Sequence, residues 1–284
     1  MKARGPNATQ IEYWNEQAGP AWVRDKSLID ALIDPLGRAV LDAAEVRSGE
    51  VVIDVGCGTG QASLELAERV GPEGRVVGID ISTPMLECAR QHASVAGLAQ
   101  LHFEAADAQT RDFTRDRFDL VFSRFGVMFF SDPVSGFSNL RCALHASGRL
   151  AFVCWQELPR NAWMRVPLQA MAPHLELPAR GDPEAPGPFA FADPERVRGI
   201  LDRAGFGAIV IEAREQPLRV GGDGGFDSAV DQALNTGPAG AAFRSAAPEQ
   251  RAAAEAAVRE ALSPHAGPDG VELASAAWIV TARP

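Results

Sequence analysis

Short apolar runs alternate with longer stretches of helical spacing between residues 51 and 154. Runs of β-branched and aliphatic residues indicate buried strands, whereas apolar residues three and four positions apart indicate amphipathic helices. This alternation is typical of βαβ units around a parallel sheet, so we predict an α/β fold. The predicted strands lie at residues 51–55, 75–79, 101–105, 118–123 and 149–154.

Proline and glycine mark the ends of the predicted helices. Three helices are expected to begin where a capping side chain precedes a proline, at Thr83-Pro84, Asp132-Pro133 and Asp193-Pro194. Three helices are expected to end at a glycine, at Gly71, Gly97 and Gly205.

The segments on either side of this core carry other patterns. Residues 8–45 are predicted to form two helices that bear Tyr13, Trp14 and Trp22 and fold across the sheet as a lid. Proline and glycine at 178–188 predict a loop. The remaining predictions are a helix at 194–204, a strand at 208–213, a break at 219–225, helices at 227–235 and 248–262, and a strand at 275–283.

Composition narrows the class of protein. The chain has 284 residues, 46% hydrophobic and 23% charged, which suits one large globular domain. Its net charge of -10 argues against nucleic acid as a partner. We expect a cytoplasmic protein without membrane insertion, because no apolar run reaches 18 residues and the start lacks a signal-like stretch. The four cysteines show no metal-binding or disulfide spacing and are expected to be reduced packing residues: Cys57, Cys88, Cys142 and Cys154.

The turn after the first predicted strand, in the stretch VIDVGCGTGQ, has three glycines at alternate positions. Dinucleotide-binding turns follow G-x-G-x-x-G, whereas Gly56, Gly58 and Gly60 follow G-x-G-x-G. Asp54 adds an acid at the strand end, where a pyrophosphate would gain nothing from negative charge. The pattern therefore favours a ligand with an amino group and a sulfonium.

The DVGCGTG stretch that begins at Asp54 resembles the first motif of class I S-adenosylmethionine (SAM) dependent methyltransferases. Asp80, at the end of the second strand, resembles the ribose-binding acid of that family, and residues 105–108 resemble its adenine-edge motif. The likeness continues through 118–130, where it is similar to small-molecule and ubiquinone or menaquinone methyltransferases. It covers residues 8–155 and is looser beyond them.

The resemblance implies a doubly wound, mostly parallel seven-stranded sheet with a reversed last strand, SAM as the cofactor and S-adenosylhomocysteine as its product. Asp80 would accept from both ribose hydroxyls, and Met85 would face the adenine. Asp107 would take the adenine amine, and the Ala108 amide a ring nitrogen. The full set expected at the cofactor is Asp54, Gly56, Gly58, Gly60, Gln61, Asp80, Ile81, Met85, Asp107, Ala108 and Ser123.

We accordingly expect a single methyltransferase domain over residues 1–284. Its predicted segments are an N-terminal helical lid (1–48), the cofactor-binding core (49–155), a substrate-covering insertion (156–192), a core helix and strand (193–218), a helical insertion (219–272) and the last strand (273–284).

Methyl transfer from a sulfonium is an in-line displacement, so the protein mainly aligns the reacting atoms and excludes water. We expect a small, partly apolar acceptor. Arg124 has two interpretations, as a clamp for an anionic group or as a surface pair with Asp132 or Asp119. Some of five aromatic residues are expected to line the acceptor site: Phe125, Phe129, Phe130, Trp155 and Trp163.

No residue stands out as the general base that a phenol or an acidic carbon needs. Structural roles suffice for His92, His102 and His145, and His265 lies in a loop without a partner in sequence. His174 is the best of the five histidines because it falls in the segment expected to cover the substrate. The predicted substrate-binding set is Arg124, Phe125, Trp155, Trp163 and His174; no catalytic residue and no metal ligand is assigned.

Two alternatives stay open at this point. The lack of an obvious base leaves a non-catalytic, methyltransferase-like nucleotide-binding module, and the nucleotide fold leaves an NAD-dependent oxidoreductase, against which the glycine spacing argues. SRFG follows the fourth strand in place of an N-P-P-Y-like motif, so the usual sign of amino-group methylation on nucleobases or glutamine is missing. Carbon, oxygen and nitrogen acceptors therefore remain possible.

Overall fold

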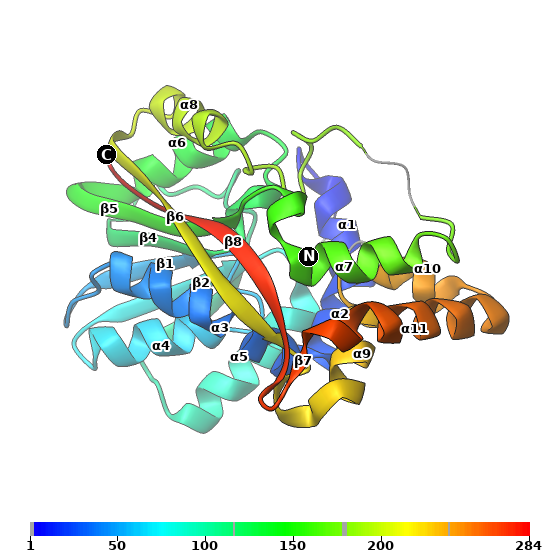
Figure 1. The fold of residues 1–284 in the computed structure, drawn as a ribbon. Coiled ribbons are helices and arrows are strands. Elements are labelled where there is room, and N and C mark those ends of the chain that lie inside the picture. Colours follow the sequence, from blue (N-terminus) through cyan, green and yellow to red (C-terminus); the bar gives the residue numbers. More distant parts are fainter. Residues whose placement is uncertain (1–2, 116, 178–180, 238) are drawn as a thin grey trace.

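A computed structural model describes residues 3–115, 117–177, 181–237 and 239–284. Its sheet has the order β3-β2-β1-β4-β5-β8-β6, with the short strand β7 paired to β8 (Figure 1). All pairings are parallel except those of β8. The predicted sheet with a reversed last strand is thus confirmed. The strands are β1 (Val51–Val55), β2 (Arg75–Asp80), β3 (Leu101–Ala105), β4 (Phe118–Arg124), β5 (Leu144–Trp155), β6 (Gly207–Val220), β7 (Ala266–Gly267) and β8 (Gly270–Arg283).

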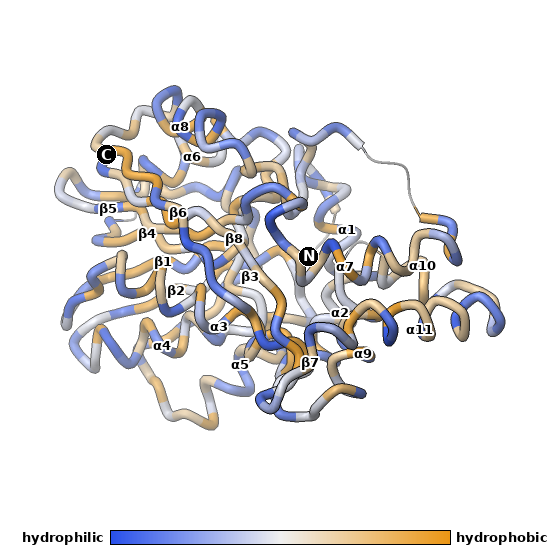
Figure 2. The backbone as a smooth tube through the Cα atoms, viewed as in Figure 1, coloured by the Kyte–Doolittle hydropathy of each residue, from blue (hydrophilic) through white to orange (hydrophobic). Residues whose placement is uncertain are grey.

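Helices cover both faces of the sheet. In Figure 1, α6 and α8 lie above it and α4 and α5 below it. Apolar residues concentrate in the strands between these layers (Figure 2), where Phe122 of β4 and Phe152 of β5 are completely buried and Phe152 contacts Phe137 of α6. The helices of this part of the chain are α3 (Lys26–Ala43), α4 (Gln61–Val70), α5 (Thr83–Ala96), η1 (Val127–Phe129), α6 (Pro133–Ala143) and α8 (Pro194–Arg203).

Two of the three predicted proline caps are confirmed. The Asp132 and Asp193 carboxylates each accept a hydrogen bond from a first-turn amide of the following helix. The third helix, α5, begins at Thr83 as predicted, but Thr83 is not its cap. The cap position is Ser82, whose side chain makes no capping bond, and the Thr83 N–H donates to Oδ1 of Asn15 in another helix. All three predicted glycine ends are confirmed by positive φ values, at Gly71, Gly97 and Gly205.

Residues 8–45 contain three helices where two were predicted: α1 (Ala8–Glu16), α2 (Ala18–Arg24) and α3. Pro20 supplies the reason, because its ring and missing N–H are incompatible with a helix that continues through the preceding turn. In Figure 1, α1 and α2 lie beyond the end of the sheet, away from the C-terminus.

The last two long strands extend beyond their predicted bounds. β6 continues to Val220 and β8 begins at Gly270 because the two strands pair with each other over this whole length. The extra part of β6 begins with polar residues and Pro217, and only Leu218 and Val220 at its end are buried, so its sequence did not mark it as a strand. The predicted break at 219–225 is accordingly shorter, and β5 starts before residue 149, at Leu144.

The insertions are mainly helical and gather at the same end of the sheet as α1 and α2 (Figure 1). The predicted helices at 227–235 and 248–262 are confirmed as α9 and α11. The predicted loop at 178–188 is confirmed for residues 181–188, while 178–180 lie outside the described residues. The elements are η2 (Leu158–Arg160), α7 (Ala162–Met171), η3 (Gly222–Gly224), α9 (Gly225–Asn235), α10 (Gly240–Ser245), α11 (Pro248–Leu262) and η4 (Ser263–His265).

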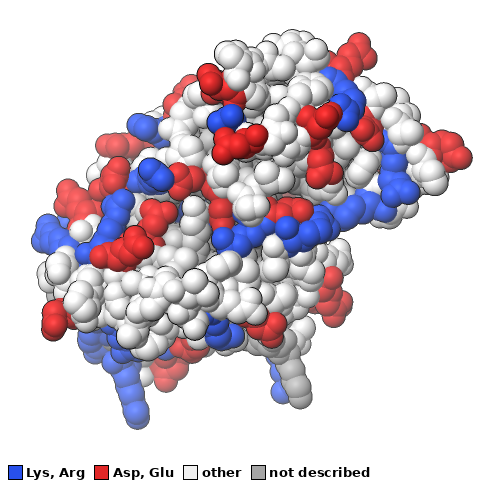
Figure 3. All heavy atoms as spheres, turned by 90° about the horizontal axis from the view of Figure 1, so that it is seen from below, with Lys and Arg blue, Asp and Glu red and all other residues white. Residues whose placement is uncertain are grey.

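The surface carries acidic and basic side chains interspersed over the face seen in Figure 3. None of the helices in the described part of the chain has the length and hydropathy to cross a membrane. The expectation that every cysteine is a packing residue is wrong for Cys142, which faces solvent on α6, whereas Cys57 and Cys154 are buried.

Candidate functional site

The glycine turn joins β1 to α4 at the carboxyl end of a central strand. Gly56, Gly58 and Gly60 have φ values of 68°, 56° and 85°, in the left-handed region that favours glycine. A Cβ on Gly56 would lie 2.7 Å from the Cα of Gly126, and one on Gly58 would lie 2.9 Å from Cε of Met85. A larger residue would therefore push the turn away from the end of β4 or from α5.

Two buried oxygen atoms in this turn, Asp54 Oδ1 and Thr59 Oγ1, have no hydrogen-bond partner among the described residues. The other Asp54 oxygen accepts from Ser63 Oγ at 2.6 Å. Burial raises the pKa of Asp54 to about 6. The first N–H groups of α4, from Gln61 on, have no acceptor within the helix. A ligand with both an ammonium and a carboxylate would satisfy these groups, as the methionine part of SAM would.

Asp80 ends β2 beside this turn and is half-buried. Its two carboxylate oxygens accept from the N–H groups of Gly58 at 2.8 Å and Ser82 at 2.7 Å. Burial raises the pKa of Asp80, although the amide hydrogen bonds oppose the shift. The amides orient the carboxylate and leave further lone pairs free, so the geometry suits a vicinal diol.

Asp107 lies in the loop after β3, the strand next to β2, and is 8% exposed. Both of its oxygens accept from Nδ2 of Asn7, at 2.9 and 3.0 Å, and one accepts from the Gln109 N–H at 2.9 Å. The neighbouring Ala108 is buried, and its N–H has no acceptor within the described part of the chain. This loop therefore offers a donor beside a carboxylate, the pair that an adenine edge requires.

Arg124 ends β4 and is directed toward helix α3, with its side chain 10% exposed. It pairs with Asp30 of α3 at 3.2 Å and donates to Oε1 of Gln61, at the start of α4. The predicted surface pair with Asp132 or Asp119 is therefore wrong. The arginine instead joins three elements around the glycine turn.

Phe125 follows Arg124 with a φ of 61°, which is rare for a bulky residue. Its ring stacks on Trp155 at the end of β5, with centroids 4.2 Å apart and planes 14° apart. Trp155 in turn contacts Trp163 of α7, at 5.0 Å between centroids. Three of the predicted acceptor residues thus form a row of rings, and backbone strain of this kind concentrates at functional sites.

The other two aromatic candidates have different neighbours. Phe129 meets Trp14 of α1 edge-on at 5.2 Å, so it contributes to the contact between α1 and η1. Phe130 packs edge-on against Phe137 in the core. Their positions separate them from the row of rings around Trp155.

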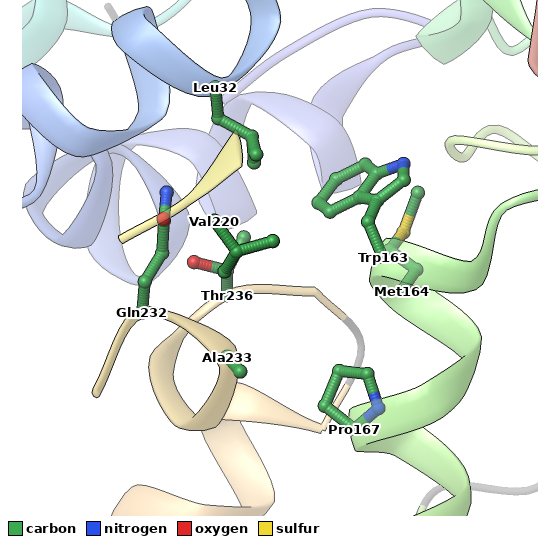
Figure 4. A pocket seen from close by; sticks show the side chains of 8 residues that line it. All are labelled: Leu32, Trp163, Met164, Pro167, Val220, Gln232, Ala233 and Thr236. Carbon is green, nitrogen blue, oxygen red and sulfur yellow. The ribbon is translucent and has the colours of Figure 1, made fainter. Parts of the chain in front are cut away.

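A small cavity adjoins this row (Figure 4). Its interior volume is about 10 Å³, close to the minimum for one water molecule. Its walls come from α3, α7, β6, α9 and the residue after α9: Leu32, Trp163, Met164, Pro167, Val220, Gln232, Ala233 and Thr236. Gln232 closes one side, because its amide binds the Gly221 N–H and the Leu28 carbonyl. A cavity of this volume is too small for an organic acceptor, so the surrounding elements would have to move apart to hold one.

The histidines do not converge on this cavity. His145 lies 2.6 Å from Asp119 at the amino end of β4, far along the sheet from the glycine turn. His174 is half-buried in the turn after α7 and does not belong to the cavity wall. No cluster of metal-binding side chains occurs among the described residues.

Sequence reasoning missed three residues at this site: Asn7, Asn15 and Asp30. Asn7 and Asn15 bind the turns around Asp107 and Asp80, and Asp30 pairs with Arg124. The partners at Ile81, Arg124 and Asp107 lie 66, 94 and 100 positions away in the chain, and no local pattern reports a pairing of that span. Only the position of Asn15 one turn from Ile11, on an apolar helix face, could have suggested that it points inward.

Several known proteins are similar to this chain in sequence or in fold. A family profile described as a methyltransferase domain matches residues 46–175. Aklanonic acid methyltransferase DauC of Streptomyces sp. is 34% identical over 187 residues, 62% of this chain and 84% of that protein. The demethylmenaquinone methyltransferase of Thermus thermophilus is 32% identical over 179 residues, 60% of this chain and 80% of that protein.

Solved structures agree on the architecture. The YcgJ protein of Bacillus subtilis has a TM-score of 0.56 and 17% identity, covering 87% of this chain and 97% of its own. The [4+2]-cyclase SpnF has a TM-score of 0.56 and 18% identity, covering 100% of this chain and 98% of its own. At this identity the likeness concerns the fold alone.

Proposed function

Because this chain belongs to the SAM-dependent methyltransferases of the class I fold, we propose that it methylates a small, partly aromatic acceptor held between β4, β5 and the inserted helices. We therefore adopt the methyltransferase in place of the two alternatives from the sequence, the NAD-dependent oxidoreductase and the non-catalytic module. The observation that carries the proposal is the row formed by Phe125, Trp155 and Trp163 next to a small cavity. Two relatives are named for aklanonic acid and demethylmenaquinone.

The cofactor would supply an electrophilic methyl group. For its binding we propose Asp54 for the ammonium, the amides at the start of α4 for the carboxylate, and Asp80 for the ribose. Asp107 and the Ala108 amide would hold the adenine edge. The remaining members of the proposed set border these groups: Gly56, Gly58, Gly60, Gln61, Ile81, Met85 and Ser123. The Ser123 hydroxyl already donates to the Val55 carbonyl, so we propose that it supports the turn.

The described wall of the cavity contains no titratable side chain. We therefore propose that the acceptor brings its own nucleophile, as a carboxylate, a phenolate or a neutral amine. The rings align the acceptor, and closure of α7 and α9 excludes water, which are the main protein contributions to an in-line displacement. Arg124 would act indirectly, because its guanidinium is already paired with Asp30.

The test has two stages. Calorimetric titration with S-adenosylhomocysteine should give a dissociation constant in the micromolar range, and absence of binding at millimolar ligand by the folded chain would contradict the cofactor site. Labelled SAM is then offered with a panel of aromatic acids, phenols, quinols and aliphatic amines. Transfer to planar aromatic acceptors supports the proposal, whereas transfer to aliphatic amines alone would contradict it.

A further inference from the structure

Helix α1 is attached to the loop that carries Asp107. The Asn7 side chain is 4% exposed, and its Nδ2 reaches both Asp107 oxygens at 2.9 and 3.0 Å. Its Oδ1 accepts from the Ser131 N–H at 2.8 Å, after the end of β4. The Asp107 carboxylate is therefore oriented by a residue that also binds the segment after β4.

The other end of α1 is attached to the turn after Asp80. Nδ2 of Asn15 donates to the Ile81 carbonyl at 2.9 Å. Oδ1 of Asn15 accepts from the Thr83 N–H at 3.0 Å, and this bond caps the start of α5. The Ser82 hydroxyl adds a bond to the Trp14 carbonyl at 2.8 Å. One helix thus connects the two turns proposed for the ribose and the adenine.

Apolar packing alone does not explain these attachments. Ile11 is the buried apolar residue of α1, and Trp14 adds an aromatic contact with Phe129. Asn7 and Asn15 add polar contacts with the two turns. The Oε1 atom of Gln10 is also buried and accepts no hydrogen bond from the described residues. The inner face of α1 therefore offers an unused acceptor between its two attachments.

We propose that Asn7 and Asn15 are positioning residues for the cofactor, an inference that rests on the proposed function. Asn7 orients the Asp107 carboxylate toward the adenine amine, and Asn15 holds the turn that presents Asp80 to the ribose. Asn7 and Asp107 are both almost completely buried, so water competes little with their hydrogen bonds.

The experiment compares two ligands that differ at the adenine amine. Dissociation constants for S-adenosylhomocysteine and S-inosylhomocysteine, in which an oxo group replaces the amine, are measured by calorimetry for the unmodified chain, Asn7→Ala, Asn15→Ala and Glu12→Ala. Glu12 is an exposed residue of α1 and serves as the matched control. The ratio of the two constants within one variant does not depend on the fraction of folded protein.

Asn7→Ala is expected to weaken the adenosyl ligand about tenfold and the inosyl ligand much less, because Asn7 acts through the amine's partner. Asn15→Ala is expected to weaken both ligands equally, and Glu12→Ala neither. Equal losses for both ligands in Asn7→Ala, unchanged binding, or tighter binding would overturn the assignment while leaving the proposed function intact. If the unmodified chain bound neither ligand, the proposed function would fail as well.

Discussion

At the scale of single residues, Asp54 is a carboxylate in a position where its charge is costly. It is completely buried, and burial raises its pKa to about 6. Because this value exceeds that of the unfolded chain, about 3.9, its contribution to stability is largest below pH 4 and is lost as the pH rises through 6. Two pKa units correspond to about 3 kcal/mol.

Asp54→Asn should therefore change the pH dependence of unfolding. Relative to the unmodified chain, the variant should gain about 3 kcal/mol in the free energy of unfolding between pH 4 and pH 8, because it has no buried carboxyl to ionise. Denaturant titrations of the ligand-free proteins at several pH values measure this difference. If the free energy of unfolding depended on pH in the same way for both proteins, the prediction would be contradicted. Affinity of the unmodified chain for S-adenosylhomocysteine should increase with pH through 6.

Asp80 offers a second prediction at this scale. Asp80→Ala removes a charged acceptor from the proposed ribose site and should weaken S-adenosylhomocysteine binding by about 2 to 3 kcal/mol. Asp223→Ala, at an exposed carboxylate on a surface turn, is the control and should bind normally. Calorimetry on both variants measures the effect; equal affinities would show that the ribose lies elsewhere.

At the scale of elements, the position of α2 depends on one glycine. A Cβ on Gly19 would lie 2.1 Å from the Trp14 carbonyl oxygen and 2.5 Å from the Ser82 hydroxyl. Gly19→Ala should therefore move α1 and α2 off the turn after β2 and increase hydrogen exchange of the amides at 8–24. Gly199→Ala, in open space on α8, should instead stabilise the chain by about 0.5 to 1 kcal/mol. Unchanged exchange in Gly19→Ala would contradict this account.

At the scale of the whole molecule, the Arg124–Asp30 pair joins the end of β4 to α3 across 94 positions of sequence. Asp30 also pairs with Lys26 at 2.8 Å, so the cluster is nearly closed to solvent. Arg124→Ala should cost about 1.5 to 3 kcal/mol of unfolding free energy, because the buried Asp30 carboxylate keeps only Lys26 as a partner. Arg259→Ala, at an exposed pair, should have no measurable effect. The prediction fails if the two variants unfold alike.

The fold of the core could be predicted because its signals are local. Apolar runs of strand length, glycines at alternate positions and acids at strand ends all occur within a few residues of the elements they specify, and β1 to β4 lie at the predicted positions. Asp54 and Asp80 could be selected for the same reason, since the carboxyl ends of parallel strands meet at one edge.

The sequence by itself determined the βαβ core and the position of the glycine turn, because short-range periodicity and backbone torsion decide both. Tertiary structure alone decided that α1 binds the turns at Asp80 and Asp107 through Asn15 and Asn7, that Arg124 pairs with Asp30, and that β6 extends along β8. These pairings join residues separated by tens of positions, and their energy comes from partners that no local pattern identifies.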